Sequence, residues 1–413
     1  MVRLIDLSHS YDILRIFPRV FPDPLRAAGH TGYTGAMRVA IATESFLPQI
    51  NGVTNSVMRV AEHLRDNGHE ALIIAPSDDS IPDTYAGFPV ITVPAISFPM
   101  YQDVRVGVTP SFVIERILTD FAPDVLHAAA PIIIGNTTLL AAARLSIPSV
   151  AIYQTDIPSY AARYGLGVLE TIAWNRVRDI HSLANLTLAP STYACEQLRD
   201  HDVPRVKIWG RGVDIERFSP AHRDPDLHET WAPNGETVIG FMGRLAPEKQ
   251  VGDLVNLLGI PGTKLVIVGG GPSKKALKAQ LPGAIFTGKL TGDELARTLA
   301  TMDVFVHPGE LETFCQAIQE ALASGVPCVA PAIGGPIDLI ESGKWGYLYP
   351  PGDFASMRAH VEKLVASPEL RYRFSLAARD FTSTRTWPVI CAQLMDYYEE
   401  AMSMASGAVL DLR

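Results

Sequence analysis

Short apolar runs alternate with longer amphipathic segments from residue 37 onward. The runs are rich in Val, Ile and Leu without strict polar alternation, which is typical of strands covered on both faces of a parallel sheet. The segments between them, such as 56–69, place apolar residues three or four positions apart and end near glycine, which predicts helices. In the first half of the chain the predicted strands are 38–44, 70–76, 90–95, 124–129, 149–156, 186–191 and 206–210.

The pattern stops at 212–236, a proline-containing segment without periodicity that we interpret as an interdomain linker. A second series follows, with predicted strands at 237–243, 264–271, 284–288, 304–309, 327–332 and 346–350. The fold class predicted is α/β, with two Rossmann-like, doubly wound parallel-sheet domains facing each other across a cleft.

The expected domains have distinct boundaries. Residues 37–212 form the N-terminal domain and 213–385 the C-terminal domain, while a last helix over 386–405 packs back toward the N-terminal domain. Residues 1–36 lack the strand pattern and are expected to be a poorly ordered leader. Ligands of open α/β sheets bind at the carboxyl ends of the strands, so the cleft between the domains is the expected site.

Composition narrows the class of protein. The 413 residues carry a net charge of −9 and only 19% charged residues, which argues against a broad nucleic-acid-binding surface. The four cysteines form no CxxC pair and fit a reducing compartment, so we expect a cytoplasmic protein. No apolar run is long enough to span a membrane.

The segment 309–330 carries two glutamates, Glu312 and Glu320, around a helix expected to begin near Thr313. Eight residues of helix separate such groups by about 12 Å, and the free N–H groups at the helix start attract anions. This spacing suits one extended ligand with hydroxyls at each end and an anion between. The alternative is that both glutamates are simply solvated.

Two further loops follow the first strands of the two domains. The segment 241–250 places Arg244 and Lys249 where a diphosphate could be held by a fork of donors and a point charge. The segment 48–56 contains Gly52, which permits close approach of the backbone to a ligand. Taken singly, each is equally consistent with an ordinary solvated loop or turn.

Together these motifs resemble the retaining glycosyltransferases of family 4, which have the GT-B fold. The resemblance covers 37–400 and is carried by "GRLAPEK", "ETFCQAIQE", "GRGVDIERFSP" and "GGPIDLI…GYLYPPGD", in which Asp338 replaces the usual Glu. The stretches "ESFLPQINGVTNSV" and "YQTDIPSYAARYG" look most like GDP-mannose-dependent α-mannosyltransferases of actinobacterial glycolipid and lipoglycan synthesis. That subgroup is also similar to sulfoquinovosyl transferases, which use a UDP-sugar.

The resemblance implies roles for single residues in binding a nucleotide-sugar donor. Arg244 and Lys249 would hold the diphosphate, Glu320 the ribose hydroxyls, and Glu312 the hydroxyls of the transferred sugar. The backbone N–H groups of Phe314 and Cys315 would assist Glu312, and Gly52 would let the N-terminal loop approach the phosphate. Arg244, Lys249 and Glu312 are also the expected catalytic residues, together with His127.

His127 matches the first histidine of the family's D-V-x-H-x-H stretch, whereas the second position is Ala129. His127 is therefore either catalytic or a buried, hydrogen-bonded strand residue. Asp156, at the end of a predicted strand, and Tyr153 are candidates for acceptor binding, and Asp156 could instead cap a turn.

The expected reaction is transfer of a hexosyl group, with mannose from GDP-mannose as the leading donor and a lipid-linked or glycan acceptor. Alternatives are a UDP-sugar-dependent glucosyl or sulfoquinovosyl transferase, a sugar-nucleotide epimerase, and a non-catalytic two-domain sugar-binding protein. No carboxylate is an obvious nucleophile, so we expect same-face attack with retention and no metal or other cofactor. Residues 159–183, with basic and aromatic side chains such as Trp174, could rest on an inner membrane leaflet or form an ordinary packed helix.

Overall fold

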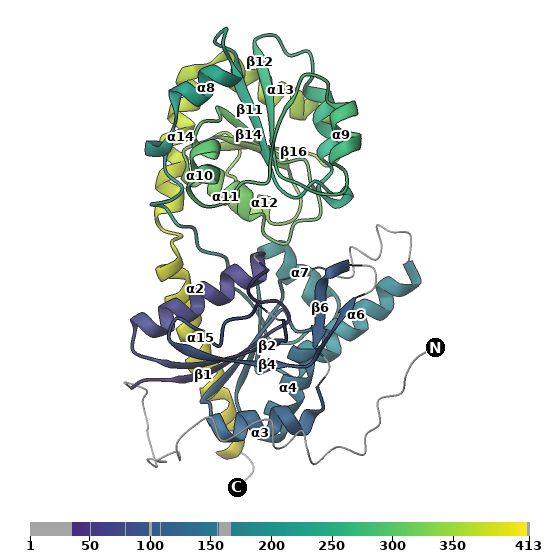
Figure 1. Ribbon diagram of the computed structural model, residues 1–413, viewed down its shortest axis with the longest axis vertical. Coiled ribbons are helices and arrows are strands. Elements are labelled where there is room, and N and C mark those ends of the chain that lie inside the picture. The colour runs from purple at the N-terminus through teal and green to yellow at the C-terminus, as the bar shows by residue number, and fades with distance from the viewer. Residues whose placement is uncertain are drawn as a thin grey trace.

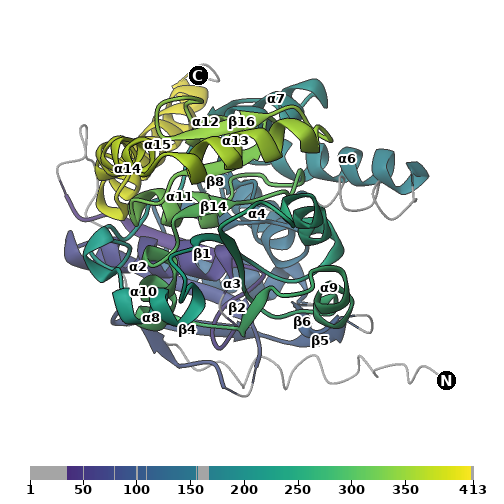
Figure 2. The same cartoon turned by 90° about the horizontal axis from the view of Figure 1, so that it is seen from above.

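The computed structural model describes residues 35–49, 51–78, 80–98, 101–107, 109–154, 156 and 167–410. All but the last two residues of the predicted leader 1–36 lie outside this range. The chain forms two α/β lobes stacked along the long axis (Figure 1). Seen from above, the C-terminal lobe lies over the N-terminal one (Figure 2).

The N-terminal lobe is built on an eight-stranded sheet in the order β10-β9-β8-β7-β1-β2-β4-β3. All neighbouring strands are parallel except β3 and β4. The strands are β1 (Arg38–Thr43), β2 (Glu70–Pro76), β3 (Thr84–Tyr85), β4 (Phe88–Val93), β7 (Val125–Ala129), β8 (Ser149–Ile152), β9 (Leu186–Ala189) and β10 (Val206–Ile208), with β5 (Ala95–Phe98) and β6 (Tyr101–Gly107) forming a separate hairpin. The helices are α2 (Gly52–Asp66), α3 (Ser111–Phe121), α4 (Ile134–Arg144), α6 (Gly167–Ser182) and α7 (Thr192–Asp200).

Helix α2 shows how local sequence fixes these elements. The Asn51 side chain accepts hydrogen bonds from the N–H groups of Val53 at 2.9 Å and Thr54 at 3.0 Å, which caps the helix start. Val57, Val60, Ala61 and Leu64 then form one buried face. This face packs on the central strands and aims the first residue of α2 at the space between the lobes.

The C-terminal lobe contains a six-stranded parallel sheet in the order β13-β12-β11-β14-β15-β16. Its strands are β11 (Thr237–Met242), β12 (Thr263–Val268), β13 (Ile285–Gly288), β14 (Val304–Val306), β15 (Cys328–Pro331) and β16 (Gly346–Tyr349). Its helices are α8 (Pro225–Trp231), α9 (Lys274–Gln280), α10 (Gly292–Ala300), α11 (Gln316–Ala323), α12 (Pro336–Leu339), α13 (Phe354–Ala366) and α14 (Pro368–Ser383), with short 3₁₀ turns η2 (Pro220–His222), η3 (Pro247–Lys249) and η4 (Val251–Leu257).

The predicted fold class is confirmed, because each predicted apolar run overlaps a strand of one of the two sheets, whose neighbouring strands are parallel except β3 and β4. The segment 212–236 is not only a linker. It contains α8, whose Trp231 is buried in the core of the C-terminal lobe. The short α8 was missed because seven residues give too few turns for a visible apolar period.

Helix α15 (Trp387–Leu410) leaves the C-terminal lobe and runs along the N-terminal one (Figure 1). Its residues Ile390, Leu394 and Tyr398 belong to the core that also contains strands β1, β7 and β8. The indole N–H of Trp209 donates to the Ile390 carbonyl at 2.8 Å. The last helix thus joins the two lobes, because it leaves the C-terminal lobe and buries apolar side chains in the core of the N-terminal lobe.

None of the helices in the described part of the chain combines the length and apolar character needed to cross a bilayer. Within 159–183, Trp174 is buried, as the alternative of an ordinary packed helix predicts. Its ring stacks on His201, with 3.8 Å between centroids. The neighbouring residues 159–166 lie outside the described residues.

Candidate active site

A cavity of about 620 Å³ lies where the carboxyl ends of the strands from the two lobes meet. The N-terminal lobe contributes the loops after β1, β7 and β8 and the start of α2, and the C-terminal lobe those after β11 and β14. The lining includes Glu44, Ser45, Gln49, Asn51, Gly52, Gln154, Asp156 and Arg211 from the first and Arg244, Lys249, His307, Glu312, Thr313, Phe314, Cys315 and Gln316 from the second.

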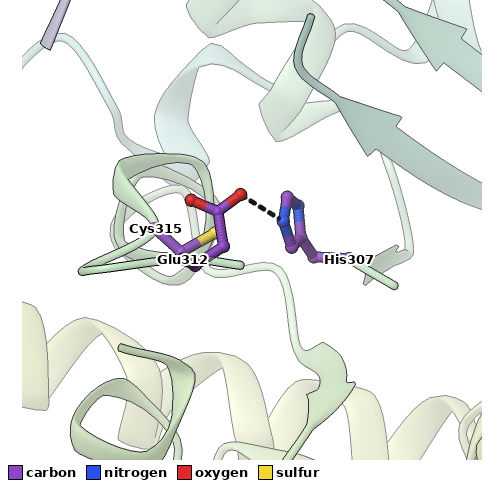
Figure 3. Close-up of side chains that lie close together, drawn as sticks. All are labelled: His307, Glu312 and Cys315. Carbon is purple, nitrogen blue, oxygen red and sulfur yellow. Dashed lines mark hydrogen bonds and ion pairs between the residues drawn. The ribbon is translucent and has the colours of Figure 1, made fainter. Parts of the chain in front are cut away.

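Glu312 is held by two side chains on one carboxylate oxygen. Lys249 Nζ lies 2.5 Å and His307 Nε2 2.8 Å from Glu312 Oε1. Figure 3 shows the carboxylate beside the His307 ring. Burial alone would raise the pKa of Glu312, but the charges of Lys249 and His307 outweigh it and lower the pKa to about 2. Glu312 is therefore ionised at physiological pH and can accept hydrogen bonds from sugar hydroxyls.

The loop that carries Glu312 is shaped by backbone contacts. Glu312 O accepts a hydrogen bond from Gly335 N at 2.8 Å. A Cβ on Gly335 would lie 2.2 Å from Phe314 O, so only glycine allows this approach. Cys315 adopts a left-handed conformation, φ 73°, and α11 begins after it at Gln316. The helix start predicted near Thr313 is thus three residues too early, because the left-handed turn interrupts the helical backbone.

Arg244 follows β11 and extends into the cavity with 57% of its side chain exposed. It forms an ion pair with Glu248, which is only 6% exposed. Lys249 is the last residue of the short turn η3, which follows β11, and Arg244 and Lys249 line the same wall. This wall therefore presents two cationic groups, one beside Glu312 and one toward solvent.

Gly52 is the first residue of α2 and lines the opposite wall. A Cβ at this position would lie 2.5 Å from Arg211 Nη1. The Arg211 guanidinium, from the junction of the two lobes, occupies the space that a side chain at position 52 would need. Gly52 thus lies where the sequence predicts a close approach, and its proposed contact with phosphate stays a prediction.

Glu320 lies on α11 but outside the residues that line the cavity. Burial raises the pKa of Glu320 to about 8, although a hydrogen bond with Gln316 and the charge of Arg217 oppose the shift. Its assignment to ribose hydroxyls stays a prediction.

The structure supports the second interpretation of His127, a buried, hydrogen-bonded strand residue, and its catalytic role stays a prediction. Its ring lies on β7 with 1% exposure, outside the cavity lining, and its Nδ1 is 2.7 Å from the Tyr398 hydroxyl. Burial lowers the pKa of His127 to about 3. The chain turns toward the cavity only at Ala130, so the histidine ends in the core between the sheet and α15.

Asp156 lines the cavity, and the Tyr153 hydroxyl donates a hydrogen bond to its Oδ1 at 3.1 Å. Tyr153 itself is buried and does not line the cavity. The arrangement makes Asp156 the candidate for contact with an acceptor and Tyr153 a residue that positions it. Both roles remain predictions.

Sequence reasoning missed several cavity residues, His307, Glu44 and Arg211 among them. His307 follows β14, and its position directly after a strand was the available signal. Glu44 follows β1 and accepts hydrogen bonds from Ile132 N, Ile133 N and Gly135 N at 2.6–2.9 Å, which fixes the start of α4. Arg211 lies inside the "GRGVD" motif.

Asp338, which replaces the usual Glu of the family motif, accepts a hydrogen bond from Thr192 N at 2.5 Å and so joins the two lobes.

Ligand atoms of His307, Glu312 and Cys315 lie within 4.8 Å of one another, a spacing that could hold a metal ion (Figure 3). Lys249 and His307 already contact one of the two Glu312 carboxylate oxygens. Burial also raises the pKa of the Cys315 thiol well above its usual range, whereas metals bind the thiolate. These residues fit an ammonium partner better than a metal.

Comparison with known proteins shows which families and structures this chain resembles. Residues 50–217 match the model of Glycosyltransferase Family 4 and 224–381 that of Glycosyl transferases group 1. The chain is 48% identical over 368 residues to a GDP-mannose-dependent alpha-mannosyltransferase of Mycobacterium tuberculosis, covering 88% of this chain and 96% of that protein. It is 32% identical over 363 residues to the sulfoquinovosyl transferase SQD2 of Arabidopsis thaliana, covering 85% and 71%. The crystal structure of Anabaena HepE in complex with UDP-glucose superposes with a TM-score of 0.68 at 20% identity, covering 88% and 100%.

The two lobes and the cavity between them have the GT-B architecture. The family matches and the identity to the mycobacterial protein show that the chain is a glycosyltransferase. The chain belongs to glycosyltransferase family 4, with a group 1 domain as its second half. The resemblance inferred from the sequence motifs is therefore confirmed.

Proposed function

We propose that this glycosyltransferase transfers α-mannose from GDP-mannose to a glycan or lipid-linked acceptor, with retention at the anomeric carbon. The observation that carries the proposal is the contact between Lys249 and Glu312 inside the interdomain cavity. A cation for phosphate and a carboxylate for sugar hydroxyls touch each other there. A sugar joined directly to a diphosphate needs this adjacency. The GDP-mannose dependence named for the 48% identical mycobacterial protein supports this donor.

Cleavage of the sugar–phosphate bond places negative charge on the departing diphosphate. Lys249 and Arg244 are fixed on one wall of the cavity and would stabilise that charge without reorganisation. Glu312, ionised and held by His307, would orient the sugar. The departing phosphate would accept the proton of the attacking acceptor hydroxyl, so that no protein nucleophile and no metal takes part.

The acceptor would enter along the N-terminal wall, where Asp156 lies. A lipid-linked acceptor would require the protein to approach the inner leaflet of a membrane without spanning it. Flotation with liposomes tests this point. Binding that does not increase with anionic lipid would remove the membrane part of the proposal.

The runner-up donor is a UDP-sugar, favoured by the 32% identity to a sulfoquinovosyl transferase. A non-catalytic sugar-binding protein is disfavoured, because sugar binding alone needs no pair of cations beside the carboxylate. A sugar-nucleotide epimerase is distinguished by its products, since it converts the donor without any acceptor.

The deciding experiment incubates the purified protein with radiolabelled GDP-mannose, UDP-glucose or UDP-sulfoquinovose and a membrane lipid extract from an actinobacterium. We expect label in lipid-soluble product from GDP-mannose only. Thermal-shift measurements with GDP, UDP and ADP provide an independent reading, because a nucleotide bound to the folded state raises the melting temperature. Incorporation from a UDP-sugar alone would replace the donor assignment.

A further inference from the structure

Arg211 is a buried cation at the junction of the two lobes. None of the donor-binding roles that the family motifs imply involves it. It lines the cavity with 9% exposure. Its Nη1 donates to Gly52 O at 2.9 Å and its Nη2 to the Gln154 Oε1 at 2.8 Å. Both acceptors are neutral oxygens, and no carboxylate in the described part of the chain forms an ion pair with it.

A guanidinium carries five N–H groups, and a buried charge is costly unless a counter-charge compensates it. Burial lowers the pKa of Arg211 to about 10, with the Glu312 carboxylate opposing the shift, so the group is charged at neutral pH. Glu312 is already engaged by Lys249 and His307. The enzyme therefore maintains a cation at the cavity that lacks an anion of its own.

A second donor lies beside it. Gln154 is 8% exposed and lines the cavity, and its Oε1 accepts from Arg211. Its Nε2 has no hydrogen-bond partner among the described residues. Buried amide N–H groups are rarely left unpaired, so an acceptor is expected from a bound ligand.

The position of Arg211 is fixed from both lobes. Its side chain contacts the N-terminal lobe, while its carbonyl accepts a hydrogen bond from Gln319 Nε2 of α11 at 2.9 Å. Arg211 and Lys249 thus lie on opposite walls near the same carboxylate, Glu312. The phosphate that is bonded to the sugar must lie next to the residue that binds the sugar.

We propose that Arg211 is a third cationic contact of the donor, binding the phosphate next to the transferred sugar from the N-terminal wall, with the Gln154 amide donating beside it. The inference rests on the proposed function, because it assumes a nucleoside diphosphate donor. It adds that the diphosphate is held from both lobes rather than from the C-terminal lobe alone.

The test compares affinities for GDP and GMP, which differ by this phosphate, by calorimetric titration at fixed ionic strength. Arg211→Gln should weaken GDP binding about tenfold or more, as expected for a lost hydrogen bond to a charged group, and GMP binding less. Arg205→Gln is the matched control, because Arg205 also donates to backbone carbonyls but lies outside the cavity. An unchanged ratio of GDP to GMP affinity in Arg211→Gln overturns the proposal.

Gln154→Glu gives a second reading that does not require removal of the arginine. The substitution keeps an acceptor for Arg211 Nη2 and adds a negative charge beside the proposed phosphate. We expect GDP affinity to fall more than GMP affinity, and an unchanged ratio again overturns the proposal. A raised KM for the acceptor with unchanged nucleotide affinity in Arg211→Gln would assign the cation to the acceptor instead.

The proposed function and the role of Arg211 are contradicted by different results. A wild-type protein that binds UDP but not GDP is tested with the UDP and UMP pair, with the same expected loss of ratio. A wild-type protein that binds neither nucleotide contradicts the proposed function itself. Binding by the wild type with no effect of either variant contradicts only the role of Arg211.

Discussion

Lys249 Nζ lies 2.5 Å from Glu312 Oε1, across 63 positions of sequence. One residue follows β11 and the other follows β14, and these strands are neighbours in the sheet. The cation expected to bind phosphate and the carboxylate expected to bind sugar hydroxyls therefore form one ion pair. Changing either residue alters the environment of the other.

Lys249→Ala should lower kcat/KM for the donor about 100-fold or more, the range found when one group that stabilises developing charge is removed. Arg244→Ala should act in the same direction. Steady-state kinetics with varied donor concentration measures the effect.

Lys344→Ala is the control for this series. Lys344 also forms an ion pair with a glutamate, Glu341, but the pair lies on the surface and outside the cavity. Its loss should leave kcat/KM unchanged. Normal transfer rates in both Lys249→Ala and Arg244→Ala would show that the diphosphate assignment is wrong.

His307→Gln should raise the donor KM about tenfold, since Glu312 loses one of its two hydrogen-bond partners. His307 stacks on Phe241 with centroids 5.6 Å apart, and His360 stacks on Tyr347 at 4.5 Å. His360→Gln therefore controls for the loss of a stacked imidazole without the contact to Glu312. If both variants change the KM equally, His307 serves packing alone.

Much of the fold follows from sequence because buried parallel strands give apolar runs of unmistakable composition. The strand β14 and the loop after it were placed correctly, and so was the pairing of "GRLAPEK" with "ETFCQAIQE" in one cleft. The start of α11 was not, since the left-handed conformation of Cys315 has no residue-type signal of the kind that glycine provides.

The sequence does not show which side chains from distant segments contact each other. His127 and His307 both follow buried apolar residues near strand ends, yet only His307 reaches the cavity. The difference depends on where each strand ends and on α15, which covers His127 with Tyr398. Such contacts between distant segments leave no pattern in either segment alone.

Stability should depend on the protonation of Glu320. Burial raises its pKa from 4.5 to about 8, so the folded state retains a proton that the unfolded chain releases near pH 4.5. The free energy of unfolding should therefore fall as pH rises from about 4.5 to about 8. Denaturant titrations should show that the free energy of unfolding falls less between pH 5 and pH 9 for Glu320→Gln than for the wild type. An equal fall in the free energy of unfolding for both proteins would show that the raised pKa of Glu320 does not contribute to stability.

Tyr398→Phe should destabilise the fold by about 1–3 kcal/mol, because it leaves the buried His127 Nδ1 without its partner. The kcat of the folded enzyme should not change, since neither residue lines the cavity. Chemical denaturation and kinetics on the same preparation measure both. A lower kcat with normal stability would restore His127 as a catalytic candidate.

The central claim is that one nucleotide-sugar lies across the cavity between the lobes. A crystal structure of the complex with GDP-mannose tests it most directly. We expect the diphosphate within hydrogen-bond distance of Arg244 and Lys249, and mannose hydroxyls on Glu312. A donor bound outside this cavity, or bound there with Lys249 and Glu312 facing away from it, would contradict the account.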